Sequence, residues 1–291
     1  MNKKGCIIAL GQWNDDRVLF KNRDRNYRNC ITFHHELRHG VEVLYFKDAL
    51  TGWIEGMNQY GIGIINATLM PSIDESRLKD SAKGDGEIIL KALEQKTVED
   101  AMDMICGYKN GLYGHTIISN ADKSYSVEHF ESEEPVCKEI NPNEDVHVRT
   151  NHGIDIPHAG VQNGNGRKST ITRRLRALKA LRNTESKESI IENIYKYRPN
   201  GFDDPHNMVR NLPNGLKTGC QYVIDPQEKT FNFYTLPYKV RILGYKCNVV
   251  KPRLKLNLFK ICKEDGQGNF KLEPYKIPKE TNPFLKGKWY N

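Results

Sequence analysis

The chain has 291 residues and a formal net charge of +8, because 44 lysine and arginine residues are interleaved with 36 aspartate and glutamate residues. Positive charge spread in this way mainly favours solubility, and no helix-turn-helix, zinc-finger or RNA-recognition pattern occurs, so we expect no nucleic-acid partner. No apolar stretch approaches the roughly 18 residues of a membrane span, and no long apolar segment follows the first lysines, so we expect neither a membrane helix nor a signal peptide.

The seven cysteines are widely scattered, and no Cys-x-x-Cys motif or zinc-ligand spacing occurs among them. An odd number of cysteines at irregular positions does not predict a disulfide framework, so we expect reduced thiols and a cytoplasmic location. For the same reason we expect no metal ion, and nothing in the sequence implies an organic cofactor.

Short apolar runs of strand length come first, at residues 6–10, 17–20, 41–46 and 61–66. Turn-forming residues at positions 14–16 separate the first two runs, which predicts a β-hairpin. The histidine-rich stretch HHELRH (residues 34–39) also contains a glutamate and an arginine, so we interpret it as a polar loop rather than a metal site.

Apolar residues at helical spacing predict two helices between Glu87 and Ile105, the second of them starting at Thr97. The elements expected farther along are strands at 114–119, 125–130 and 146–149, helices at 169–182 and 186–197 (the latter capped by Thr184), and a strand pair at 221–224 and 231–234. Because strands and helices do not alternate strictly, this order predicts an α+β fold in which helices cover two antiparallel sheets. Beyond about residue 240 the chain is rich in lysine and proline and shows no periodicity.

Reactive and polar residues stand at the ends of several of these runs. Gly5 and Cys6 open the first strand, and the sequence KNRD (residues 21–24) lies on the strand that returns from the hairpin. The sequence GMNQYGIGIINATL (residues 56–69) forms a turn and a strand that ends near Asn66. After a later strand come Thr150, Asn151 and His152, and the run STITR (residues 169–173) ends in Arg173.

In this order the features resemble the cysteine branch of the N-terminal nucleophile (Ntn) hydrolases. That branch includes choloylglycine hydrolases, penicillin V acylases and isopenicillin N acyltransferase-like proteins. The resemblance implies a four-layer αββα sandwich, with a short propeptide (1–5), an Ntn domain (6–240) and a basic carboxyl-terminal extension (241–291) of open role. It also implies hydrolysis of a linear, non-peptide amide C–N bond through a thioester with the enzyme.

The same resemblance implies that Cys6 is the nucleophile. A thiol with a pKa of about 8.5 can be deprotonated by its own α-amine, with a pKa of about 7.7–8.0, once residues 1–5 are gone. The thiol itself would cut the chain after Gly5, because glycine tolerates strained backbone beside an attacking group. The other implied roles are orientation of the α-amine by Asp24, stabilisation of the oxyanion by Asn66 and Asn151, support by Arg173, and a substrate contact by Lys21, which stands where choloylglycine hydrolases carry arginine.

Other functions stay open at this point. An acyltransferase would pass the acyl group to an amine instead of water, and a non-catalytic binding protein would keep only the fold. For the enzymes, the expected partner is a small-molecule amide, and a homo-oligomer is compatible with the sequence. Cys220 also follows a glycine and competes as nucleophile, but its apolar strand favours a packed thiol. We interpret His152 as an ordinary exposed histidine.

Overall fold

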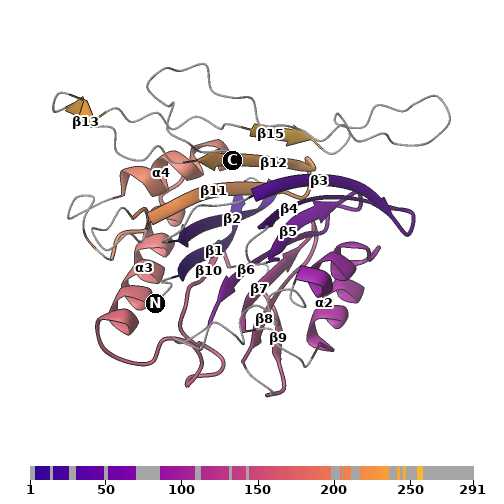
Figure 1. Ribbon diagram of the computed structural model, residues 1–291, viewed down its shortest axis with the longest axis horizontal. Helices are drawn as coiled ribbons and strands as arrows, with labels where there is room; N and C mark the ends of the chain where they lie inside the picture. The colour runs from indigo at the N-terminus through magenta and orange to yellow at the C-terminus, as the bar shows by residue number, and fades with distance from the viewer. Residues whose placement is uncertain are drawn as a thin grey trace.

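The computed structural model describes residues 4–13, 16–25, 31–48, 52–69, 86–108, 113–130, 133–141, 144–197, 204, 206–210, 217–235, 241–242, 245–246 and 254–257. Among these residues the chain forms two large antiparallel sheets that stack face to face, as Figure 1 shows. A separate short pair, β13 (Arg241–Ile242) and β14 (Tyr245–Lys246), joins neither sheet.

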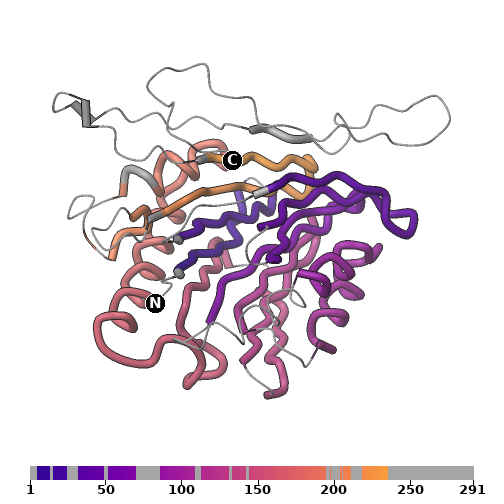
Figure 2. Tube along the Cα trace, in the orientation of Figure 1, coloured from indigo at the N-terminus to yellow at the C-terminus, as the bar shows by residue number. Residues whose placement is uncertain are grey.

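The first large sheet contains the amino-terminal hairpin. Its described strands follow the order β10 (Val146–Arg149), β1 (Lys4–Trp13), β2 (Asp16–Arg25), β11 (Lys217–Asp225), β12 (Thr230–Thr235) and β15 (Leu254–Asn257). The predicted hairpin of β1 and β2 is confirmed, and Figure 2 shows it in indigo beside the orange β11, about 200 residues later in the chain. Because β15 pairs with β12, part of the predicted extension joins this sheet.

The second large sheet is a meander in which each strand pairs with the next. Its described strands are β3 (Ile31–Arg38), β4 (Val41–Asp48), β5 (Ile54–Asn58), β6 (Gly63–Thr68), β7 (Gly114–Ser119), β8 (Ser124–His129) and β9 (Val136–Glu139). The prediction of a polar loop at residues 34–39 is wrong, because most of this stretch lies in β3. As an outer strand of the sheet, β3 can carry polar side chains that an inner strand could not.

Helices cover the outer face of each sheet (Figure 1). On the first sheet lie α3 (Gly164–Arg182) and, after the turn η1 (Lys187–Ser189), α4 (Ile190–Lys196). On the second lie a helical segment at 86–93 and α2 (Val98–Cys106), whose N-cap Thr97 accepts the main-chain N–H of Asp100 as predicted. Thr184 is not a cap, because its hydroxyl donates to the main-chain oxygen of Ala180 at 2.9 Å.

The alternation of side chains in β1 explains the layering. Cys6, Ile8 and Leu10 pack between the sheets, whereas Ile7 and Ala9 pack against α3 and α4. A further apolar cluster lies between the second sheet and its helices. The described residues therefore form the predicted four-layer αββα sandwich. None of the described helices is long and apolar enough to cross a membrane.

A disulfide joins Cys106, at the end of α2, to Cys137 in β9. The expectation of reduced thiols throughout is therefore wrong. The two cysteines are 31 residues apart, one at the end of a helix and one in a strand, and no sequence motif pairs cysteines at such positions. Cys6 and Cys220 are thiols outside any disulfide. Because disulfides persist mainly in oxidising compartments, this bond removes the premise on which a cytoplasmic location was predicted.

The buried His129 is expected to make the fold sensitive to acid. Its Nε2 donates to the main-chain oxygen of Ile105 at 3.0 Å, and burial lowers its pKa from 6.5 to about 4. Below pH 6.5 the unfolded chain binds a proton that the folded chain refuses until about pH 4, so stability is lost as pH falls through this window. Between about pH 7 and pH 5 we expect this residue to cost roughly 2 kcal/mol of unfolding free energy in urea titrations. His129→Gln keeps the donor but does not titrate, and an equal acid loss in this variant would contradict the assignment.

Candidate active site

Cys6 lies near the start of β1 with its side chain buried between the sheets and only 1% exposed. Its main-chain N–H donates to Asn151 Oδ1 at 3.1 Å, and its main-chain oxygen accepts from Arg173 Nη1 at 3.1 Å. Both groups therefore point away from β2, which makes Cys6 and Arg23 a non-hydrogen-bonded cross-strand pair with closely spaced side chains.

Asn151 is fixed at each polar atom. It follows β10, the neighbour of β1, and its main-chain N–H donates to Thr170 Oγ1 at 2.8 Å. Its Oδ1 faces only donors, Cys6 N–H and Arg173 Nη2 (2.7 Å), while its Nδ2 donates to the main-chain oxygen of Thr68 at 2.8 Å. The side-chain amide can satisfy these partners in one orientation only, because an oxygen must face the donors.

The loop after Asn151 is anchored by a buried carboxylate that sequence reasoning missed. Glu128 in β8 accepts the main-chain N–H groups of Ile154, Asp155 and Ile156 at distances of 3.0–3.2 Å. These bonds offset the burial of its charge, although burial still raises the pKa of Glu128. Glu128 thus supports the loop that carries Asn151.

Asp24 lies on the other face of β2, toward α3. Its Oδ1 accepts from Asn22 Nδ2 at 2.8 Å and from Thr218 Oγ1 at 2.7 Å, and its Oδ2 lies 3.6 Å from Arg173 and 3.4 Å from Arg210. Two guanidinium groups thus flank one carboxylate, and their charges stabilise its ionised form.

Arg210 and Thr218 were missed at the level of sequence, and Asn22 was noted only as part of the KNRD motif, without a role. Burial lowers the pKa of Arg210, and the negative charge of Asp24 opposes this shift. Thr218 also accepts the main-chain N–H of Arg210 at 2.9 Å, which joins the two residues around Asp24.

Gly5 lies directly against this carboxylate. A Cβ added to Gly5 would approach Asp24 Oδ2 to 3.1 Å and Arg173 Nη2 to 3.7 Å. Such a contact is tight, so the site accommodates the bare backbone of glycine before Cys6. Asn151, Arg173 and Asp24 therefore all lie against one side of the Gly5–Cys6 peptide.

Lys21 and Arg23 alternate with Asn22 and Asp24, and so they point between the sheets. Lys21 Nζ forms a buried ion pair with Glu55 and donates to Asn66 Oδ1 at 3.4 Å. Arg23 forms a second buried ion pair, with Asp48, and lies 5.6 Å above the ring of Phe46. The predicted site residues are thus divided: Cys6, Asp24, Asn151 and Arg173 form one network, and Lys21 and Asn66 form another with Glu55.

The environments of His152 and Cys220 are also defined. The expectation that His152 is exposed is wrong: its Nδ1 lies 3.1 Å from Thr150 Oγ1 and 3.2 Å from Thr170 Oγ1, and burial lowers its pKa to about 4. Cys220 is completely buried in the apolar layer between the sheets, opposite Arg23, as expected for a packed thiol.

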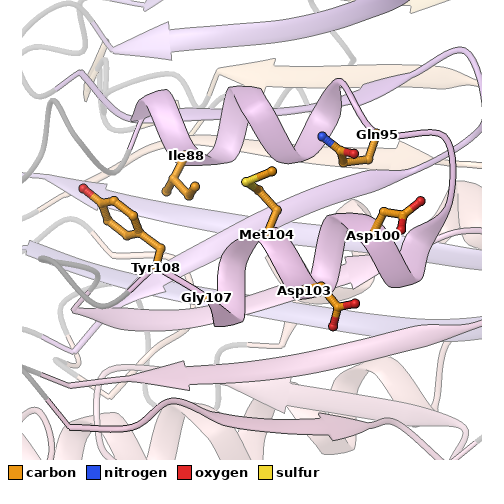
Figure 3. A pocket seen from close by; sticks show the side chains of 7 residues that line it. All are labelled: Ile88, Gln95, Asp100, Asp103, Met104, Gly107 and Tyr108. Atoms are coloured by element: carbon orange, nitrogen blue, oxygen red, sulfur yellow. The ribbon is translucent and has the colours of Figure 1, made fainter.

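A shallow groove of about 540 Å³ lies elsewhere, between the helical segment 86–93 and α2. Figure 3 shows its lining, which includes Asp100, Asp103, Met104 and Tyr108. These helices cover the outer face of the second sheet, so that sheet separates the groove from Cys6. None of the predicted site residues lines it.

The stacked sheets with their flanking helices define the Ntn-hydrolase fold. Among solved structures, a variant of the conjugated bile acid hydrolase from Clostridium perfringens superposes with a TM-score of 0.55 and 12% identity, covering 94% of this chain and 96% of that one. A second variant of that hydrolase gives a TM-score of 0.53 and 13% identity, with coverages of 96% and 99%. The Caenorhabditis elegans ortholog of N-acylethanolamine-hydrolyzing acid amidase gives a TM-score of 0.51 and 14% identity, with coverages of 76% and 93%.

The sequence itself identifies the family. Residues 12–236 match the model of acyl-coenzyme A:6-aminopenicillanic acid acyl-transferase, and the chain belongs to this family of Ntn proteins. The match begins after Cys6, so it includes Asp24, Asn66, Asn151 and Arg173 but not the predicted nucleophile. No curated protein sequence matches the chain.

Proposed function

We propose that the protein is a thiol-dependent amidohydrolase that matures by removing residues 1–5 and uses Cys6 as its nucleophile. The observation that carries this proposal is the set of contacts around the Gly5–Cys6 peptide. Asn151 and Arg173 hold the main chain of Cys6 at 3.1 Å each, and Asp24 lies against Gly5. A purely structural strand end does not need a buried carboxylate between two arginines, because such charges are costly to bury.

Maturation would proceed by an N-to-S acyl shift. Cys6 Sγ attacks the carbonyl carbon of Gly5, the Gly5–Cys6 C–N bond breaks, and the thiol proton passes to the departing nitrogen. Water then hydrolyses the thioester, which releases residues 1–5 with a new carboxylate and regenerates the thiol. The freed α-amine remains next to Asn151 Oδ1 and near Asp24, which can hold it by a charge-assisted hydrogen bond.

Turnover would repeat the same chemistry on a small linear amide. The α-amine takes the proton of Cys6 Sγ, the sulfur attacks the substrate carbonyl carbon, and the side-chain amide of Asn66 stabilises the oxyanion. The C–N bond breaks as the leaving amine takes the proton back, and water releases the acid from the thioester. These steps call for no metal ion or organic cofactor.

Acyl transfer is the second candidate, and the family description favours it. In that reaction an amine, rather than water, attacks the thioester and receives the acyl group. The two reactions share Cys6, Asp24 and the amide of Asn66, and they differ only in the acceptor. The substrate would in both cases be a small amide.

The test is the intact mass of the purified protein, followed by assays with a panel of N-acyl p-nitroanilides. We expect the chain to have lost residues 1–5 and to release p-nitroaniline. With added glycine, N-acylglycine in excess of the free acid would support the transferase. A full-length chain that resists iodoacetamide and releases no p-nitroaniline would contradict both reactions and support a binding protein.

A further inference from the structure

We infer that Glu55 is a positioning residue for the side-chain amide of Asn66, and that Lys21 links the two. This inference rests on the proposed function, because it concerns the groups that stabilise the oxyanion formed by Cys6. It also gives Lys21 a role different from the substrate contact expected from the sequence.

The contacts among the three residues are direct. Glu55 Oε1 pairs with Lys21 Nζ and accepts the main-chain N–H of Asn66 at 3.4 Å, while Lys21 Nζ donates to Asn66 Oδ1 at 3.4 Å. None of the three side chains is more than 3% exposed. Each member of the cluster therefore contacts the other two.

The chemistry of the ammonium group fixes the orientation of the amide. Lys21 has hydrogen-bond donors and no acceptor, so the atom of Asn66 that faces it must be the oxygen. The nitrogen then points away, and Asn66 Nδ2 has no hydrogen-bond partner within the described part of the chain. A buried, unengaged N–H₂ is the kind of donor that a developing oxyanion requires. Asn151 Nδ2, by contrast, already donates to Thr68.

Neighbouring residues link the cluster to the hairpin that carries the thiol. Arg23 pairs with Cys6 across the β1–β2 hairpin, contacts the ring of Phe46 in the second sheet, and Phe46 in turn pairs with Glu55 on the neighbouring strand. Strand β6, which carries Asn66, packs against both β1 and β2. Ile65 and Ala67, on either side of Asn66, pack in the same layer as the side chain of Cys6. Asn66 Oδ1 meets that layer through Lys21 Nζ.

Stability does not explain this buried ion pair. Two charges taken out of water often cost more than their attraction returns, and apolar replacements are commonly neutral or stabilising. The fold could therefore fill this place with apolar side chains. Apolar side chains could not bind the Asn66 oxygen and so leave its amide nitrogen available as a donor.

The experiment follows removal of residues 1–5 by intact mass, which needs no added substrate, in wild type, Glu55→Gln, Asn66→Ala and the double variant. We expect Asn66→Ala to slow the cut by about 10²–10³-fold, as for loss of an oxyanion donor. Glu55→Gln should slow it by about 10²-fold through misplacement of the amide. In the Asn66→Ala background Glu55→Gln should have no further effect, which a general structural role would not produce.

The matched control is Asp48→Asn, which breaks the other buried ion pair of this layer, at Arg23, and leaves Asn66 untouched. It should lower stability as Glu55→Gln does but keep the rate of the cut. If Glu55→Gln does not fold, Lys21→Met combined with Glu55→Gln removes both charges and should fold and still cut slowly. Wild-type cleavage by a folded variant lacking Glu55 would overturn the inference, whereas an uncut wild-type chain would overturn the proposed function itself.

Discussion

Replacing Cys6 with alanine is expected to leave residues 1–5 on the chain and to lower amide hydrolysis by about 10⁶-fold. The substitution removes the only atom that the proposal assigns to attack, both on Gly5 and on the substrate. Without the first cut, the main-chain nitrogen of residue 6 stays an amide and cannot act as a base. Intact mass and the release of p-nitroaniline measure the two effects separately.

Cys220→Ala is the matched control for this variant. Both cysteines are buried in the layer between the sheets, and both lie opposite Arg23, one on each side of β2. They differ in that the main chain of Cys6 contacts Asn151 and Arg173. We therefore expect Cys220→Ala to be processed and to hydrolyse amides like the wild type. The opposite pattern would place the nucleophile on β11 rather than β1.

The sandwich could be predicted because the alternation of side chains along each strand indicates which residues face which layer. In β1, Cys6 and Ile8 pack between the sheets, whereas Ile7 packs against the helices. This period of two is visible in the sequence without any tertiary information. The strand β3 was missed because its polar stretch at the sheet edge breaks that pattern. The Cys106–Cys137 disulfide was missed because spacing alone does not bring two cysteines together.

The candidate site could be predicted only in part. Asn151 and Arg173 reach Cys6 across 145 and 167 residues, and only their order within a known family pattern connected them beforehand. No such pattern indicated Thr218 or Arg210. Thr218 reaches Asp24 because β11 pairs with β2 in a register that sets the two residues opposite each other, and Arg210 is bonded to Thr218. That register depends on the folded sheet. Glu55 was missed since its burial cannot be read from a strand sequence.

The hairpin also explains how one short motif serves two regions. Along KNRD, alternate residues enter opposite layers, so Asp24 meets the two arginines on the helix side while Lys21 meets Glu55 between the sheets. Cys6 lies near the start of the neighbouring strand β1. Its backbone contacts Asn151 and Arg173, whereas its thiol points into the layer between the sheets. A strand end is thus suited to combine a base held on one face with an oxyanion donor on the other.

The helix-side region leads to the last prediction, for Asp24→Asn. Asparagine keeps the shape and an oxygen for Asn22 and Thr218, but it leaves the buried Arg173 and Arg210 without their shared carboxylate. We expect a loss of about 3–5 kcal/mol in unfolding free energy, as for a broken buried ion pair. We also expect no amide hydrolysis, because the α-amine would lose the charge that holds it. Urea unfolding and the p-nitroanilide assay measure these effects.

Adding Arg210→Met to Asp24→Asn separates charge balance from catalysis. The second change removes one uncompensated guanidinium while Arg173 keeps its bonds to Cys6 and Asn151. The double variant should therefore regain part of the lost stability, and it should still hydrolyse no amide. If activity returned together with stability, Asp24 would act only as a counterion to the arginines. If the double variant is stable but inactive while its Cys6 is intact, Asp24 is needed to orient the α-amine.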